Sequence, residues 1–488
     1  MTTAFDLEAC RRLPLADAAL RLLDFATDDA FLDGVFARHR GRSYESTIAF
    51  PTFVHLIADA LLGHRGRSAH RTFQHARADE SLEATVQAMY GKLRRVPLDL
   101  SLGLFAESAA RLRSVASEAV AHELPKSLDA FWVLGFDGKK IKYVAQRLKP
   151  LRGLKGEIYG GKLLVVQDLA TRQAVAVEAR EDGEAGDSPL APGAVARVRA
   201  LAGDRPRLWV GDRAFCDYKL LGLLAADADG FVVRFNTSCG FHTDSSVLPR
   251  TGVDDEKRPY REEWGWLGDP KNPHRIRVRR IAIDRPGDPL IFVTSLLDAD
   301  RHPAADLLTL YRSRWGIETM FQRVVQTFDL RHLIGAAPKA TVFQAVLCLL
   351  LYNATLIVRD YVAFGAGVEP EDVSLDLLFD AVRRDLTGCM EVIGGEAILE
   401  LIAATRMKSP GELREHLRKI LGGLGTELWK KSPTRKRPQT GPKRAYLCGG
   451  HSSVDKILRG VHKEIPFQPK KPKAPPEEPP PFETKKHS

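Results

Sequence analysis

Two aspartates close short apolar segments of the chain, and a glutamate lies within a helical pattern far downstream. Asp137 ends the segment FWVLGFD and Asp212 ends RLWVGD, and both segments are typical of strands. Glu318 lies in YRSRWGIETMFQRVV (311–325), one helical turn after Arg314 and on nearly the same face as a stripe of apolar residues. A carboxylate there is costly unless it is paired or bound to a metal. Two interpretations of Glu318 remain open: a salt-bridge partner of Arg314, or the last ligand of a site assembled from distant segments.

Three carboxylates without a histidine partner favour one kind of metal chemistry. In an open sheet, side chains at the carboxyl ends of adjacent strands converge on the crevice where ligands bind. A helix packed against that sheet would add the third carboxylate. Oxygen ligands prefer hard ions such as Mg²⁺, with Mn²⁺ as a substitute. Two such ions about 3.5–4 Å apart suit in-line phosphoryl displacement, because one activates the attacking oxygen and the other stabilises the leaving oxygen. If Glu318 completes a trio with Asp137 and Asp212, the chemistry that these residue types favour is phosphoryl transfer.

Other acidic residues offer alternatives, because a strand-end aspartate is often only a turn former or a helix cap. Asp168 also ends a strand, and we expect it to begin the turn before the next strand. Asp187 precedes Ser-Pro, where we expect it to cap a helix. Spacing alone excludes neither residue from the site. Three further carboxylates are expected in a solvated loop: Glu178, Asp182 and Glu184.

The segments around Asp137 and Asp212 predict an α/β fold. Short apolar or alternating runs between 131 and 180 are typical of three consecutive strands. A helix follows at AVARVRALA, and then a strand (RLWVGD), a helix (DYKLLGLLAA) and a strand (GFVVRFN). Three strands in a row followed by strand, helix and strand predict a mixed sheet with helices on its faces.

Composition and periodicity divide the rest of the chain. The most apolar stretch, 341–358, is interrupted by polar residues, and we interpret it as a core helix and not a membrane span. Pro303 suits the first turn of the helix that carries Glu318. The predicted segments are a helical N-terminal region (1–125), the first part of the α/β core (126–236), a β-rich insertion (237–300), the rest of the core (301–360), a helical C-terminal region (361–430) and a basic, Pro-rich tail expected to be disordered (431–488).

The charge of the chain points to a polyanionic partner. The 72 Lys and Arg residues exceed the 62 Asp and Glu residues, which gives a net charge of +10 over 488 residues. Charge alone does not separate nucleic acid from an anionic membrane. The six cysteines show no paired spacing, which is typical of reduced cytosolic thiols. The N-terminus has no signal-peptide pattern. These features predict a cytoplasmic protein that meets a polyanion.

Three segments in order resemble the DDE transposases of the IS4-type insertion-sequence family, over roughly residues 125–360. The segment FWVLGFDGKKIKY is similar to the family's first strand and aspartate, and VGDRAF with DYKLLGLL is similar to its second strand, Asp-Arg pair and helix. The third segment resembles the signature Y-(2)-R-(3)-E-(6)-K, with Tyr311, Arg314 and Glu318 at the required intervals. The last signature position is Val325 instead of lysine.

The resemblance implies an RNase H-like core in which Asp137, Asp212 and Glu318 hold the catalytic metals. It further implies that Tyr311 and Arg314 contact the DNA phosphates beside the cleaved bond. The long interval between Asp212 and Glu318 matches the insertion that IS4-type enzymes carry before the glutamate helix.

Further DNA contacts are expected around this core. In the family, an aromatic residue of the insertion commonly stacks on a flipped base, and the candidates are Trp264 and Trp266. Basic residues that follow the two aspartates are also expected to bind DNA: Lys139, Lys140 and Arg213. Lys139, Lys140 and Lys142 would compensate in part for the lysine that Val325 replaces.

The expected function is a Mg²⁺-dependent DNA transposase of a bacterial, nucleoid-associated insertion sequence. Water nicks the element end, and the freed 3′-hydroxyl attacks the second strand or the target, so that the reaction is cut-and-paste. The helical N-terminus is expected to recognise terminal repeats of double-stranded DNA, and pairing two ends requires a homodimer in the working complex. Two alternatives remain: a degenerate or domesticated DNA-binding descendant, which Val325 favours, and a structure-specific nuclease that cuts but does not join.

Overall fold

The computed structural model describes most of the chain. The described residues are 12–43, 45, 47–62, 69–116, 124–142, 148–152, 157–201, 203, 205–254, 256–284, 289–314, 316–317, 320–322, 324, 334–392, 395–431 and 451–461, with no side chains described for 390–396 and 399. Glu318, Val325 and two parts of the predicted tail, 432–450 and 462–488, lie outside these residues.

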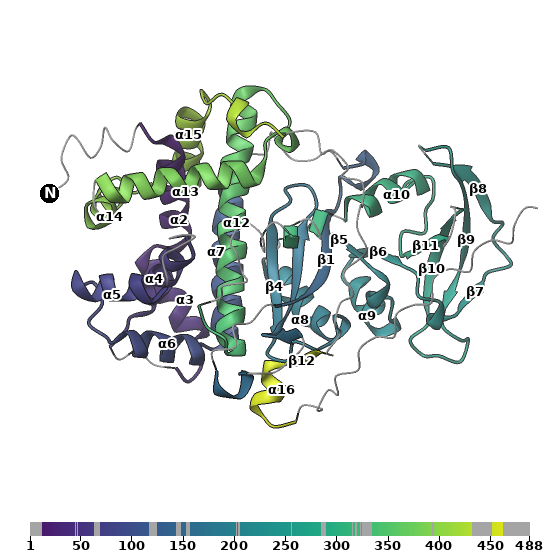
Figure 1. Ribbon diagram of the computed structural model, residues 1–488. Helices are drawn as coiled ribbons and strands as arrows, with labels where there is room; N and C mark the ends of the chain where they lie inside the picture. Colours follow the sequence, from purple (N-terminus) through teal and green to yellow (C-terminus); the bar gives the residue numbers. More distant parts are fainter. Residues whose placement is uncertain are drawn as a thin grey trace, which may run out of the picture.

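One large sheet forms the centre of the protein (Figure 1). Five of its strands lie in the order β4-β3-β1-β5-β6. β1 pairs antiparallel with β3 and parallel with β5, β3 pairs antiparallel with β4, and β5 pairs parallel with β6. This order is that of an RNase H-like fold. The strands are β1 (Trp132–Lys140), β3 (Lys162–Asp168), β4 (Ala174–Arg180), β5 (Arg207–Gly211) and β6 (Gly230–Arg234).

Helices cover both faces of this sheet. Parallel strands require crossover connections, and these are α8 (Ala191–Leu201) before β5 and α9 (Tyr218–Leu224) before β6. Both crossover helices share one apolar core with Leu134 of β1, whereas the neighbouring Val133 belongs to the core on the other face, because successive side chains alternate. The other face is covered by α7 (Leu98–Val115) and α12 (Pro338–Ala366). The predicted fold class, a mixed sheet with helices on both faces, is confirmed.

The β-rich segment extends the same sheet. The next strand, β11, pairs antiparallel with β6, and β10, β9 and β7 follow, with β8 also paired to β9. The insertion is therefore joined edge to edge to the core and forms the right-hand end of the molecule in Figure 1. Its strands are β7 (Phe241–Thr243), β8 (Arg250–Val253), β9 (Pro259–Leu267), β10 (Ile276–Ile283) and β11 (Leu290–Thr294).

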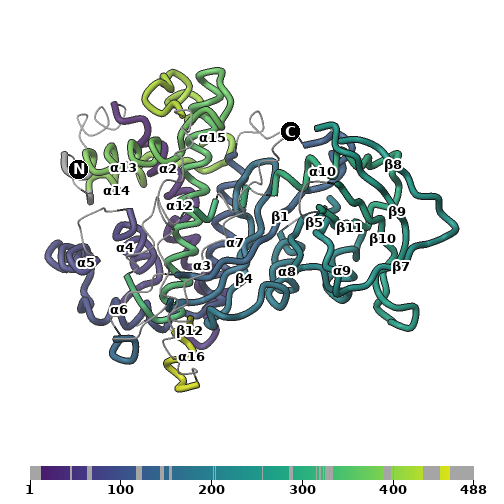
Figure 2. Tube along the Cα trace, turned by 45° about the vertical axis from the view of Figure 1, so that its right-hand side comes forward, coloured from purple at the N-terminus to yellow at the C-terminus, as the bar shows by residue number. Residues whose placement is uncertain are grey.

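Helices from both ends of the chain form one body beside the sheet. The C-terminal helices pack on α2, and α12 lies between these helices and the sheet in both Figure 1 and Figure 2. Its bounds include the apolar stretch 341–358, and it is the one described helix long and apolar enough to span a membrane; that stretch is wholly buried inside the protein, as expected for a core helix. The remaining helices are α2 (Pro14–Thr27), α3 (Asp29–His39), α4 (Phe50–Leu62), α5 (Ala69–Ala78), α6 (Val86–Arg95), α13 (Leu375–Val392), α14 (Gly395–Ala404) and α15 (Pro410–Leu421).

Residues 451–461, the C-terminal strap, differ from the disordered tail that the sequence predicts. β12 (His451–Ser453) pairs parallel with β2 (Glu157–Tyr159), and α16 (Val454–Leu458) follows it directly. Val454 and Ile457 are three residues apart, so they share one helix face, and that face is buried in a small apolar cluster with Ile158. A short amphipathic pattern thus forms structure within a composition that is otherwise typical of disorder.

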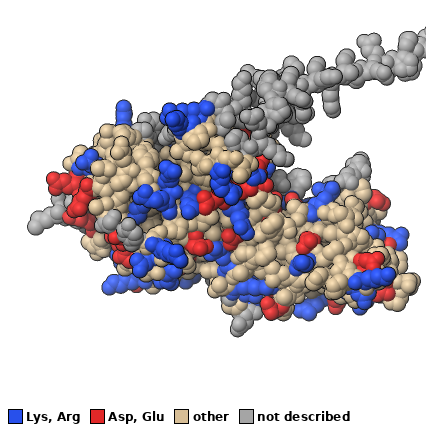
Figure 3. Space-filling model, turned by 90° about the horizontal axis from the view of Figure 1, so that it is seen from below, with Lys and Arg blue, Asp and Glu red and all other residues tan. Residues whose placement is uncertain are grey.

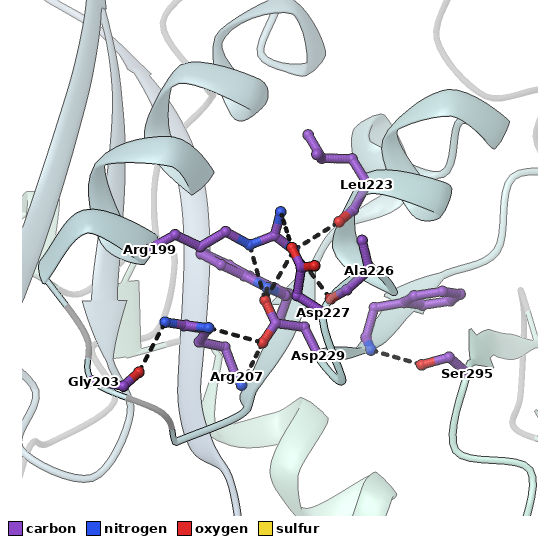
Figure 4. A network of polar contacts seen from close by, with 10 residues as sticks. Arg199, Gly203, Arg207, Leu223, Ala226, Asp227, Asp229 and Ser295 are labelled. Atoms are coloured by element: carbon purple, nitrogen blue, oxygen red, sulfur yellow. Dashed lines mark hydrogen bonds and ion pairs between the residues drawn. The ribbon is translucent and has the colours of Figure 1, made fainter.

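A buried carboxylate fixes the start of β5 (Figure 4). Asp229 accepts hydrogen bonds from the Arg207 backbone N–H (2.8 Å) and the Trp209 indole N–H (3.2 Å). It also accepts from Arg199 Nη2 of α8 (3.0 Å), which donates to two carbonyl oxygens at the end of α9 as well. The network therefore joins two crossover helices to the strand whose other end leads to Asp212.

Loss of this carboxylate is expected to destabilise the fold. Asp229→Ala should lower the free energy of unfolding by about 3–5 kcal/mol, because it leaves the buried Arg207 without its counter-charge and Arg199 with only an exposed partner. Asp227→Asn is the matched control: that side chain is 74% exposed at 3.5 Å from Arg199, so its loss should cost less than about 1 kcal/mol. Urea unfolding followed by tryptophan fluorescence measures both. Equal losses in the two variants would contradict a structural role for the network.

The C-terminal strap is expected to protect β2. A chain ending after residue 450 should show amide hydrogen exchange in β2 and at 182–185 that is about 10-fold faster or more, since apolar cover and hydrogen bonds to the strap are lost. A chain ending after residue 461 keeps the strap and serves as the control. Identical exchange in the two truncated chains would show that the strap adds no stability.

Candidate active site

The structure brings Asp137 and Asp212 together. β1 and β5 pair in parallel with Gly135 opposite Val210, and each aspartate lies two residues further along its strand direction. Neighbouring strands are about 4.8 Å apart. Since side chains alternate, both aspartates project to the face of the sheet that α12 covers.

Burial makes the Asp137 carboxylate costly to ionise. Its pKa is raised from 3.8 to about 6, mainly by burial and further by the nearby charges of Asp212 and Asp187. The guanidinium of Arg314 and the backbone N–H of Gly138, 2.9 Å from Oδ1, act in the opposite direction. A cation bound between the two aspartates would relieve this repulsion.

Asp212 serves first as a cap. Its Oδ1 accepts the Ala214 N–H at 2.8 Å and begins the short helix η5 (Arg213–Phe215). The turn-forming role of a strand-end aspartate therefore applies to Asp212. Because a carboxylate offers several acceptor positions on two oxygens, this cap leaves capacity for a metal ion.

Tyr311 and Arg314 lie on the same side of the sheet as the aspartates. Tyr311 is buried in α10 (Ala304–Ser313), with its ring stacked at 5.9 Å and 7° on Phe292 of β11. Burial raises the pKa of Tyr311, while the Arg314 charge lowers it. Arg314 is buried, and its guanidinium lies 5.6 Å from the centre of the Tyr311 ring. The positive charge of Arg314 lowers the pKa of Asp137. Arg314 thus faces the carboxylates from inside the protein and not from an open surface.

Helical residues on both sides of position 318 pack over the sheet. A Cβ on Gly135 would lie 2.7 Å from Ile317 Cδ1, so Ile317 rests on β1 two residues before Asp137. Met320 Sδ lies 3.7 Å from Gln167 Nε2 of β3. Glu318 itself lies outside the described residues, among which no group of three potential metal ligands occurs. The trio therefore stays a prediction, with two members placed side by side.

Arg172 holds the junction that leads to Glu318, and no sequence signal indicates it. Its guanidinium donates to the carbonyl oxygen of Ser313 (2.8 Å) at the end of α10. The same nitrogen lies 2.8 Å from where a Cβ on Gly316 would be, so a larger residue at 316 would displace it. Arg172 belongs to the turn that follows β3. Its contacts therefore link this turn to the end of α10 and to the helical residues after it.

The two alternative aspartates have different outcomes. Asp168 Oδ1 accepts backbone N–H groups two and three residues further on, which is the turn that the sequence predicts. The expectation that Asp187 caps a helix is wrong: its side chain forms no capping hydrogen bond. It forms an ion pair with Lys162 and occupies the space where a Cβ on Gly138 would lie. Asp187 is thus a neighbour of Asp137 that acts through its charge.

The acidic residues expected in a solvated loop are all paired in the structure. Glu178 lies in β4, where Arg197 Nε donates to it at 3.0 Å. Asp182 and Glu184 form ion pairs with Lys456 of the C-terminal strap, at 3.5 and 2.6 Å. The loop is fixed by a segment about 270 residues away, a contact that local sequence patterns do not indicate.

Basic residues follow each of the two aspartates in the sequence. Lys139 Nζ lies 5.5 Å from the Phe321 ring, and Lys140 Nζ lies 4.6 Å from the Tyr159 ring. Arg213, directly after Asp212, is exposed. The position of these cations suits contacts with phosphates that approach the carboxylates.

The two tryptophans of the insertion differ. Trp264 is 8% exposed, and its indole N–H donates to the Leu297 carbonyl at 2.8 Å, so it packs inside the insertion. Trp266 is partly exposed, with the guanidinium groups of Arg275 and Arg277 at 4.7 and 5.9 Å from its ring. Of the two, only Trp266 is accessible from the surface, so it stays the candidate for stacking on a base.

Comparison with known proteins supports a transposase domain. Residues 134–354, which include the positions of all three predicted ligands, match the family model described as the transposase DDE domain. This match supports a DDE transposase family for that region, and with it a nuclease or strand-transferase type of enzyme. No curated protein matches the sequence.

One similar solved structure is the cryo-EM structure of the piggyBac transposase synaptic complex with hairpin DNA. The two proteins share 12% identity over 86% of each chain, with a TM-score of 0.38. This likeness is too low to bear on the function of the present chain.

The pKa of Asp137 predicts a pH-dependent stability. The folded protein holds a proton on this carboxyl more tightly than the unfolded chain, so stability should fall as pH rises from about 4 to 6, by up to about 3 kcal/mol. Asp137→Asn removes the cost and should be more stable than the unmodified protein by about 2–3 kcal/mol at pH 7 without divalent ions, but not at pH 4. Urea unfolding at several pH values measures the difference. A variant with the same advantage at both pH values would contradict the prediction.

Proposed function

We propose that this protein is the DNA transposase of an insertion sequence of the IS4 type, which cleaves and transfers DNA strands by a cut-and-paste route. The observation that carries the proposal is the placement of Asp137 in β1 next to Asp212, which directly follows the neighbouring β5, within the region that matches the transposase DDE domain. The helix segment with the signature spacing packs over the same face.

The proposed cofactor is Mg²⁺, with Mn²⁺ as a substitute. Asp137, Asp212 and Glu318 would hold it, and the two described carboxylates fit a hard cation because they are close, partly buried and offer only oxygen. When bound, such ions activate the attacking oxygen and stabilise charge on the leaving oxygen. Arg314 lies close enough to Asp137 to lower its pKa, and there it would orient a phosphate that enters the site. The Tyr311 ring packs near the Arg314 guanidinium and would hold it in position.

The proposed partner is double-stranded DNA, from both the element ends and the target, bound by a homodimer in the bacterial nucleoid. The net charge of +10 and the basic residues near the aspartates support DNA as the partner. In this proposal, Trp266 stacks on a displaced base and Val325 weakens the positioning of the DNA end, without removing the metal chemistry.

Metal-dependent cleavage tests the proposal. Duplex DNA that carries the sequences flanking this gene is incubated with the full chain and Mg²⁺, and nicked and joined products are separated on denaturing gels. Asp137→Ala and Asp212→Ala should each lower the cleavage rate by about 100- to 1,000-fold or more, because each removes a metal ligand. Asp168→Asn is the matched control, a strand-end aspartate used in a turn, and it should retain cleavage.

The products distinguish the proposal from its alternatives. Cleavage without joining would replace the transposase by a structure-specific nuclease. Absence of cleavage by the unmodified protein would contradict the proposal, and a gain of cleavage in Val325→Lys would then identify a degenerate copy. Cleavage that persists in Asp137→Ala would exclude Asp137 as a ligand.

A further inference from the structure

A basic groove opens between the helical region and the sheet. It has a volume of about 1030 Å³ and is bounded by the end of α3, α6, the first turn of α12 and Leu458 of the C-terminal strap. Apolar side chains such as Phe36 and Leu100 form part of its wall. Among the described residues, six cationic side chains line it against a single carboxylate, Glu181: Arg40, Arg42, Lys92, Arg94, Arg95 and Lys339.

Most of these charges are available to a ligand. Arg40, Arg42, Arg94 and Arg95 are exposed, and among the residues that the structure describes, no carboxylate forms an ion pair with any of the four. Lys339 is 3.8 Å from Glu181, which is the only carboxylate in the described lining. Like charges in one groove repel each other, so a bound polyanion would stabilise the arrangement.

The end of α12 adds a second feature that favours an anion. The groove reaches Ala337, the N-cap residue of α12, and Pro338, the first residue of this 29-residue helix, whose N-terminus has no side-chain cap. Backbone N–H groups and the positive end of the helix dipole at such a terminus attract phosphate. Cationic side chains and a helix terminus therefore converge on the same space.

The groove lies close to the predicted cleavage site. Lys140 of β1 is opposite Lys162, and Lys162 is opposite Arg180, the residue before Glu181. Arg180 is therefore two strand spacings across the sheet and three residues along the strand direction from Asp137. This displacement is about 15 Å, the length of about four base pairs of duplex. Figure 3 views the protein from the side on which α6 and α16 lie in Figure 1, and it shows many Lys and Arg side chains over the helical region.

We propose that this groove binds the phosphodiester backbone of duplex DNA a few base pairs away from the bond that is cut. The proposal rests on the proposed function and adds the place of the flanking duplex. The arginines would hold the backbone by charge and hydrogen bonding without reading the bases, so they would set the register of DNA relative to Asp137 and Asp212.

The salt dependence of DNA binding tests the groove. Binding of a duplex of about 40 base pairs of arbitrary sequence is measured by fluorescence anisotropy without divalent ions, over about 50–300 mM salt. The double variant Arg94→Ala, Arg95→Ala should reduce the slope of log affinity against log salt by about 2 and weaken binding at about 100 mM salt by about 10- to 100-fold. Arg42→Ala, in a turn outside any helix, should reduce the slope by about 1.

The matched control is the pair Arg418→Ala, Lys419→Ala. These two exposed cations lie in the last turn of α15, at the opposite end of the molecule from α6 in Figure 1, just as Arg94 and Arg95 lie in the last turn of α6. The control should leave the slope unchanged. Equal effects of the two pairs would overturn the proposal, because net charge alone would then explain binding.

A catalytic variant separates this inference from the proposed function. Asp137→Asn with Asp212→Asn should abolish cleavage and keep the full salt slope. If the unmodified protein cuts DNA while neither the Arg94/Arg95 pair nor Arg42 affects the slope, the groove proposal fails and the function stands. If the slope falls as expected but no DNA is cut, the groove proposal stands and the function fails. Tighter binding of an RNA duplex in the groove would also overturn the proposal.

Discussion

Two carboxylates held side by side where neighbouring strands end repel each other, and the fold must keep them there. The parallel register of β1 and β5 brings Asp137, within β1, close to Asp212, which directly follows β5. The Asp229 network holds β5 at its other end, and Arg314 supplies one positive charge next to Asp137. The folded protein therefore stores an electrostatic cost at one point and spreads the stabilising contacts over strands and helices around it.

The sequence predicts the parts of this arrangement that follow from local rules. Short apolar runs that end in aspartate indicate strands, and the strand-end rule brings Asp137 and Asp212 to one crevice. Contacts between distant segments were not predictable in the same way. Asp187 differs from the expected cap because Lys162, which lies on another strand, attracts its carboxylate. The C-terminal strap depends on two apolar residues three positions apart, a signal too short to stand out in a Pro-rich segment.

Burial changes the interpretation of two predicted DNA contacts. Arg314 has its guanidinium inside the protein, so a phosphate can meet it only deep in the site, beside Asp137. Trp264 uses its indole N–H for a carbonyl of its own domain, whereas Trp266 is partly exposed with two guanidinium groups near its ring. Residue type and spacing identified these positions. Only the packing shows that Arg314 and Trp264 are buried and that Trp266 is part of the surface.

The edge-to-edge pairing of β11 with β6 also has a mechanical meaning. Three residue pairs join these strands, and β6 is in turn paired to β5, the strand that ends beside Asp212. Hydrogen-bonded strands of one sheet bend and twist together. The insertion is therefore held to the core by strand pairing and not by a flexible linker alone. A force on the outer strands of the insertion would be transmitted to β5 as a twist of β6, because β6 pairs with both β11 and β5. A rotation of the insertion relative to the core would therefore have to twist β6 and β5, and β5 ends directly before Asp212.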